Sequence, residues 1–73
     1  MLPVNVAALE IFEAGTAVTP DLIKAKGLAN GAGDGIKILG VGDVSKKLTV
    51  KAHAFSAGAK AKIEAAGGTC EVV

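Results

Sequence analysis

The chain of 73 residues is long enough for one small domain and too short for two. Eight lysines, no arginine and seven acidic residues leave a net charge of +1. The single cysteine cannot form an internal disulfide, which excludes a disulfide-stabilised module and favours a reducing compartment such as the cytoplasm. No apolar run approaches the ~20 residues of a membrane span, and the first residues lack the pattern of a signal peptide.

Positive charge is concentrated in the second half of the chain. Residues 1–36 hold two lysines against four acids, whereas residues 37–73 hold six lysines against three acids. Arginine is the residue best suited to bidentate recognition of phosphates and bases, and lysine offers only a point charge. Any contact with nucleic acid should therefore be largely independent of base sequence.

The first predicted element is a helix over residues 6–14. Asn5 is placed to cap it and Gly15 to stop it. Its carboxylates, Glu10 and Glu13, fall on a polar face with no cleft implied around them, so we expect them to be solvated. The apolar face comprises Ala8, Leu9, Ile11 and Phe12.

A second, shorter helix is predicted to follow Thr19 as its cap. Pro20 suits the first helical position and Gly27 the stop. A helix of about two turns is not stable alone, so it must be stabilised by packing against neighbouring elements. The glycine-rich residues 29–35 then predict a mobile loop.

Alternating apolar and polar residues predict three strands, over residues 36–39, 47–55 and 69–73, with a glycine turn at residues 40–43. In the second strand Leu48 and Val50 face inward and Lys47, Thr49 and Lys51 outward. In the last strand Cys70 and Val72 should face inward.

A third helix is predicted over residues 57–66, capped by Ser56 and stopped by Gly67. Its buried stripe would be Ala59, Ile63 and Ala66. Strand, helix and strand in this order imply a right-handed crossover and a parallel pairing of residues 47–52 with residues 69–73. The predicted class is α/β.

Catalytic, metal and cofactor sites are not expected. The Gly31, Gly33 and Gly35 series precedes a strand instead of opening a helix, which is the wrong place for a dinucleotide fingerprint. Ser56 and His53 lack a nucleophile elbow and an acid to orient the histidine, so Ser56 is better explained as a cap. His53 and Cys70 supply only two of the three or four ligands of a zinc site.

The lysines of the second half are the remaining candidates for function. Together with His53 they suggest an RNA-binding surface formed by Lys37, Lys46, Lys47, Lys51, His53, Lys60 and Lys62. On a regular strand, Lys47, Lys51 and His53 would project from the same face, and Lys46 directly precedes them. The alternative is that lysines only solvate a small, alanine-rich domain, because neither arginine nor interleaved aromatics support a dedicated nucleic-acid face.

Two long segments resemble a known family. The segments VNVAALEIFEAGTAVTPDLIKAKGL and GIKILGVGDVSKKLTVKAHAFSAGAKAKIEAAGGTCEVV are similar to the C-terminal half of the bacterial large-subunit ribosomal protein L-fifteen family. The resemblance covers residues 4–73, and its most specific parts are KILG, KKLTVKAHAFSAGAKAKIEAAGG and the ending EVV. Residues 1–3 would then be a leading or linker segment and residues 4–73 one C-terminal globular domain.

The resemblance implies a single small α/β domain of irregular β-β-α superhelical turns with a parallel-leaning sheet. It also implies a structural, non-enzymatic component of the large ribosomal subunit. Such a component would bind large-subunit ribosomal RNA and neighbouring ribosomal proteins in the cytoplasm and support subunit assembly. The chain departs from the family in lacking the long basic, arginine-rich N-terminal half, so we expect an excised C-terminal domain.

Two other functions are weighed against this one. A protein-interaction module would pack an exposed edge or its alanine-rich helix against a neighbouring protein without touching RNA. A small hydrolase would use Ser56 and His53, which the missing acid and elbow argue against. Salt dependence distinguishes the RNA-binding protein from the protein-interaction module, because phosphate contacts weaken steeply as salt rises and apolar protein contacts hardly change.

Overall fold

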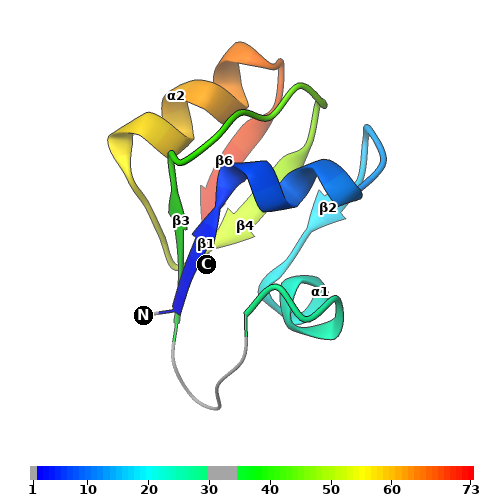
Figure 1. Cartoon of the computed structure of the whole chain (residues 1–73), viewed down its shortest axis with the longest axis vertical. Coiled ribbons are helices and arrows are strands. Elements are labelled where there is room, and N and C mark those ends of the chain that lie inside the picture. The colour runs from blue at the N-terminus through cyan, green and yellow to red at the C-terminus, as the bar shows by residue number, and fades with distance from the viewer. Residues whose placement is uncertain (1, 30–34) are drawn as a thin grey trace.

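Two three-stranded parallel sheets connected by short helices form the protein (Figure 1). The computed structural model describes residues 2–29 and 35–73. In chain order the elements are β1 (Leu2–Asn5), the 3-10 helix η1 (Val6–Ile11), β2 (Ala17–Val18), α1 (Pro20–Ala25), β3 (Ile36–Leu39), β4 (Thr49–Ala52), β5 (Ala54–Phe55), α2 (Ala57–Ala65) and β6 (Thr69–Val72). The loop predicted at residues 29–35 lies largely outside the described residues. None of the described helices is long and apolar enough to cross a membrane.

Successive strands alternate between the two sheets. The first sheet has the order β1-β3-β5 and the second the order β2-β4-β6, and all neighbouring strands are parallel. Each superhelical turn of the chain therefore adds one strand to each sheet. This arrangement confirms the predicted α/β class with irregular β-β-α turns, and neither described sheet closes into a barrel.

Side chains from both sheets and from the helices join one apolar core. Ile36 and Ile38 of β3 and Val50 of β4 are completely buried, as their alternation predicted. Leu9 and Ile63 add the helical contribution. Burying each of these side chains contributes about 1.5–3 kcal/mol, and no polar or charged side chain among the described residues is fully buried.

The segment predicted as one strand over residues 47–55 is two strands in different sheets. β4 ends at Ala52, and β5 begins at Ala54 after a break at His53. β4 pairs with β2 and β6, whereas β5 pairs with β3. The prediction of a single strand was wrong because the chain changes sheet at His53, which its alternating pattern does not reveal.

The first helix is a 3-10 helix and not the longer α-helix expected over residues 6–14. In a 3-10 helix residues three apart share a face, so Val6, Leu9 and Phe12 are the buried residues. Ile11, which α-helical spacing placed on the apolar face, is 59% exposed. The Asn5 side chain makes no capping hydrogen bond, so that prediction was also wrong.

Both α-helices begin at the predicted caps. The Thr19 hydroxyl accepts from the Leu22 N–H, and the Ser56 hydroxyl accepts from the Ala59 N–H. Gly27 and Gly67 follow the two helices with positive φ angles, as helix stops require.

The last strand pairs as predicted, but one of the two side chains expected to face inward is exposed. β6 runs parallel to β4 with Thr49 opposite Thr69 and Ala52 opposite Val72. Cys70 is partly buried against the core, whereas Val72 is 72% exposed. The expected burial of Val72 was wrong because the core does not extend to the end of β6.

Candidate nucleic-acid interface

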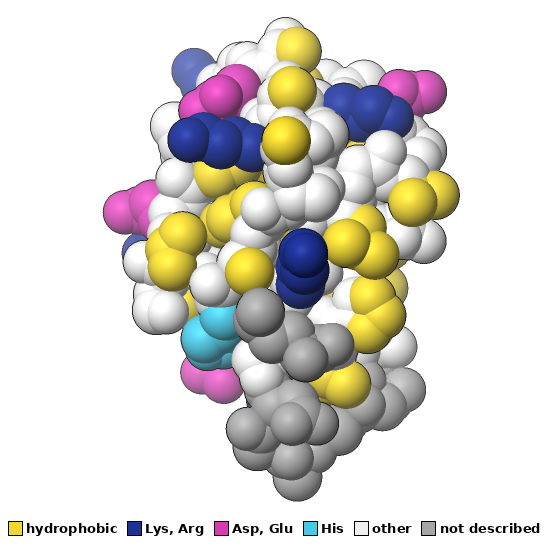
Figure 2. Space-filling view, turned by 90° about the vertical axis from the view of Figure 1, so that its left-hand side faces the viewer, with side chains coloured by type: hydrophobic (Ala, Val, Ile, Leu, Met, Phe, Trp, Pro, Cys, Tyr) yellow, Lys and Arg dark blue, Asp and Glu magenta, His cyan; other side chains and the backbone are white. Residues whose placement is uncertain are grey.

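The seven predicted RNA-contact residues are spread over several elements of the structure. Lys46 and Lys47 lie on the segment between β3 and β4, and Lys51 lies on β4. Lys60 and Lys62 lie on α2, two residues apart and therefore on different faces of the helix. Lys37 lies on β3, and His53 is bonded to the neighbouring Ile36. Lys46, Lys47 and His53 are outside β4, because that strand spans only Thr49–Ala52. Figure 2 shows that lysines on the side of the molecule formed by α2 and the first sheet stand apart, with apolar side chains between them.

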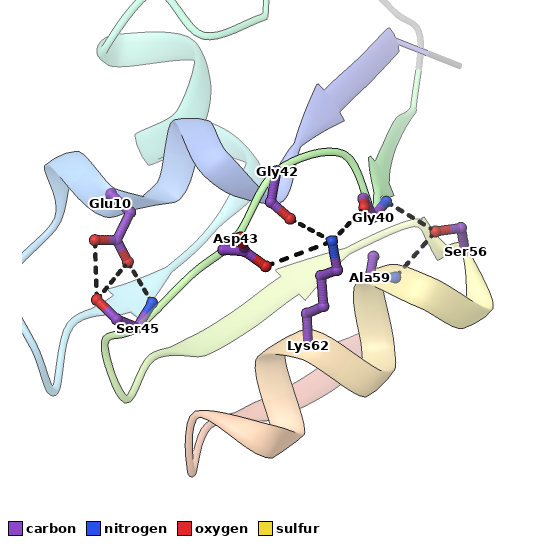
Figure 3. A network of polar contacts seen from close by, with 8 residues as sticks. All are labelled: Glu10, Gly40, Gly42, Asp43, Ser45, Ser56, Ala59 and Lys62. Carbon is purple, nitrogen blue, oxygen red and sulfur yellow. Dashed lines mark hydrogen bonds and ion pairs between the residues drawn. The ribbon is translucent and has the colours of Figure 1, made fainter.

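Lys62 fastens α2 to the glycine turn at residues 40–43 (Figure 3). Its ammonium donates to the backbone oxygen of Gly40 at 2.9 Å and to that of Gly42. It also lies 3.7 Å from the carboxylate of Asp43, whose side chain is 96% exposed. Lys62 therefore satisfies carbonyl oxygens of the turn, a role that the sequence pattern did not indicate.

Ser56 makes a second bond to the same turn. Its hydroxyl accepts from the Ala59 N–H and from the Gly40 N–H, each at 3.1 Å. The backbones approach closely here, because a Cβ built on Gly40 would lie 2.7 Å from the carbonyl carbon of Gly58. The cap is thus also a tertiary contact between the first turn of α2 and the end of β3.

Glu10 ties η1 to the segment before β4. Its carboxylate accepts from the backbone N–H and from the hydroxyl of Ser45, and its own backbone oxygen accepts from the ammonium of Lys46. The Ser45 backbone N–H holds the pKa of Glu10 below its ordinary value of 4.5, with help from the Ser45 hydroxyl and the Lys46 charge. Glu10 is accessible to solvent, as expected of a solvated charge, but the sequence pattern did not indicate its bonds to Ser45.

Lys51 has an acidic neighbour in the same sheet. Its ammonium lies 3.9 Å from the carboxylate of Glu71, which is its register partner on β6. Both side chains are well exposed, so the pair contributes at most about 1 kcal/mol and leaves most of the lysine charge accessible.

The side chains of Lys37, Lys47 and Lys60 are exposed and make no hydrogen bond or ion pair with any described residue. Lys37 projects from the middle of the first sheet, between register partners Pro3 and Ala54 that carry no charge. The stem of Lys47 passes beside Gly67, just after α2. Among the seven predicted contact residues, these three ammonium groups are the ones most readily available to an external anion, and Lys24 and Lys26 at the end of α1 are also exposed.

His53 is held by the backbone of β3. Its ring nitrogen Nδ1 accepts from the Ile36 N–H at 3.0 Å, and its own backbone N–H donates to the Ile36 oxygen at 3.0 Å. The side chain is otherwise exposed. This reciprocal pair joins the sheets at the point where the chain crosses between them.

The described residues offer little for catalysis or for a metal. Within residues 2–29 and 35–73 no three His, Cys, Asp or Glu side chains gather as a metal site would require. Burial raises the pKa of the Cys70 thiol and the Glu64 carboxylate raises it further, which disfavours a reactive thiolate. A shallow groove of about 350 Å³ beside α2 is lined by Asp43, Val44, Ser45, Lys62, Ala65 and Ala66.

Comparison with known protein families assigns the chain to one of them. Residues 3–71 match the model of a ribosomal protein family that comprises the 50S proteins L15 and L18e and a 60S counterpart. The chain belongs to this ribosomal protein family. The resemblance inferred from the sequence is thereby confirmed, and the family supports a structural role in the large ribosomal subunit and in translation.

Proposed function

We propose that this ribosomal protein domain binds large-subunit ribosomal RNA through its lysine-rich surface and supports subunit assembly without catalysing a reaction. Its partners would be that RNA and neighbouring large-subunit proteins, and its place the cytoplasmic ribosome. The single observation that carries the proposal is that the chain belongs to a ribosomal protein family and that three of its predicted contact residues, Lys37, Lys47 and Lys60, are exposed with side chains that have no described partner.

Binding would rest on charge and shape. Ammonium groups contact phosphate oxygens and release counterions, which fixes position on the RNA without reading bases. Lys46 and Lys62 add positive charge to the surface. Lys46 also donates to the backbone oxygen of residue 10, and Lys62 donates to those of residues 40 and 42, so these bonds hold the segment between β3 and β4 in place. The fold would therefore supply a rigid scaffold on which the free lysines are spaced.

The proposal is tested by two variants that lose the same charge. Lys47→Ala with Lys60→Ala removes two unpartnered lysines beside α2, whereas Lys24→Ala with Lys26→Ala removes two around the end of α1, at the opposite end of the molecule (Figure 1). Binding of large-subunit ribosomal RNA is measured by titration at about 50 and 200 mM salt. For two to three phosphate contacts, wild-type affinity should fall roughly 10- to 40-fold over this range.

The two variants should behave differently. The Lys47 and Lys60 pair should weaken binding and reduce the slope of log affinity against log salt by about 2, since two phosphate contacts are lost. The Lys24 and Lys26 pair should bind nearly as the wild type does. Equal losses in both pairs would contradict the assignment of the surface.

A protein-interaction module is the second candidate, and one observation favours it. Val72 and Val73 at the free edge formed by β6 are 72% and 59% exposed, which is unusual for large apolar side chains. Association through this edge would hardly depend on salt. A partner captured with salt-independent affinity, together with undetectable RNA binding at about 50 mM salt, would favour this function over the first.

A further inference from the structure

His53 occupies the crossing point between the sheets in a fixed orientation. The Ile36 N–H donates to Nδ1 of the ring and the His53 backbone N–H donates back to the Ile36 oxygen, each at 3.0 Å. The first bond holds the ring against the β3 backbone, and the second fixes the His53 backbone beside the same residue. The ring is thus positioned by β3 and not by its own loop.

This bond determines which ring nitrogen is free to donate. A neutral imidazole has one acceptor nitrogen and one N–H, and here Nδ1 is the acceptor. The proton therefore resides on Nε2, whose N–H points away from the β3 backbone. Nε2 makes no hydrogen bond within residues 2–29 and 35–73, and the side chain is exposed.

Lys37 follows Ile36 directly, so its backbone lies next to the residue that holds the His53 ring. It is exposed, and its register partner Ala54 follows His53 in the chain. Across the strand on the other side lies Pro3, which has neither charge nor a backbone N–H to donate. The two side chains thus combine one mobile charge with one fixed, uncharged donor.

We propose that Lys37 and His53 together bind a phosphate group of ribosomal RNA, with His53 acting as a neutral hydrogen-bond donor through Nε2. This inference rests on the proposed RNA-binding function and assigns a specific contact within it. A phosphate oxygen accepts from the Nε2–H, and the Lys37 ammonium supplies the opposing charge. Binding at this position would require no charge on His53, which separates it from the lysine contacts.

Two substitutions separate the two nitrogens of the ring. His53→Asn keeps an oxygen near the Nδ1 position to accept from Ile36 but has no donor where Nε2 lies. His53→Gln reaches the Nε2 position with an amide N–H but cannot replace Nδ1. Both variants are compared with Lys37→Ala and with the wild-type chain. Each protein is titrated with large-subunit ribosomal RNA, transcribed as overlapping fragments, at a temperature below its unfolding transition.

His53→Asn should keep the wild-type urea midpoint and bind RNA at least about 10-fold more weakly, as loss of one charge-assisted hydrogen bond predicts. His53→Gln should unfold at lower urea and bind with nearly wild-type affinity. Lys37→Ala should reduce the salt slope by about 1, whereas His53→Asn should leave the slope unchanged, since a neutral donor releases no counterion.

Two results would overturn the inference. Wild-type affinity in a folded His53→Asn variant would show that Nε2 contacts no phosphate. A salt slope reduced as strongly as in Lys37→Ala would show that His53 acts as a cation. If either result is found and the Lys47→Ala, Lys60→Ala double variant still binds RNA more weakly than the wild type, only the inference about His53 fails. Absence of salt-dependent RNA binding by the wild type would instead remove the RNA-binding function itself.

Discussion

Replacing Ser56 with alanine should destabilise the protein about twice as much as removing an ordinary helix cap. The Ser56 hydroxyl accepts from two backbone N–H groups, that of Ala59 in α2 and that of Gly40 after β3. The alanine variant loses both bonds at once. It also leaves the partly buried Gly40 N–H without its described acceptor.

The magnitude follows from the two bonds. Loss of an N-cap costs about 1 kcal/mol, and an unsatisfied, partly buried N–H about 1 kcal/mol more. The free energy of unfolding should therefore fall by about 2 kcal/mol. Thr19→Ala is the matched control, because the Thr19 hydroxyl accepts only the cap bond from Leu22 and its loss should cost about 1 kcal/mol.

Urea unfolding followed by circular dichroism measures both variants. With a slope of about 1 kcal/mol per molar urea for a domain of this size, the midpoint should fall by about 2 M for Ser56→Ala and by about 1 M for Thr19→Ala. Amide hydrogen exchange at Gly40 should accelerate in the first variant only. Equal midpoints for the two variants, or unchanged exchange at Gly40, would refute the double role of Ser56.

Three further predictions concern the same part of the fold. Gly40→Ala should cost about 2–3 kcal/mol by calorimetry, because its Cβ would lie 2.7 Å from the Gly58 backbone, whereas Gly58→Ala meets nothing closer than 3.7 Å and should stabilise α2 by about 0.5–1 kcal/mol. Glu10→Gln should lower the free energy of unfolding at pH 7. The difference from wild type should shrink as the pH falls from the ordinary carboxyl pKa of 4.5 through the lowered native pKa, because the stabilising ionised form is lost. Urea midpoints measured across pH 2–7 would record this change, and a constant difference would exclude an ionised Glu10 as the acceptor. Lys62→Met should cost about 1 kcal/mol in urea unfolding by releasing the 40–43 turn, and an unchanged midpoint would show that its bonds contribute nothing.

The sequence alone determined the features that depend on neighbouring residues. Thr19 and Ser56 cap their helices as predicted, since each bond spans three residues and needs only the local backbone. The glycine stops and the buried alternation of β3 were correct for the same reason. The family could also be recognised, because its residues occupy a nearly continuous segment.

Only the tertiary structure decided where the chain changes sheet and which charges remain free. The bonds that hold Lys62 to Gly40 and Glu10 to Ser45 join residues 22 and 35 positions apart. Such partners depend on how the superhelical turns stack, and a helical or alternating pattern carries no information about them. The break at His53 has the same origin, because both sheets accept the same alternation and the bonds to Ile36 select the point of crossing.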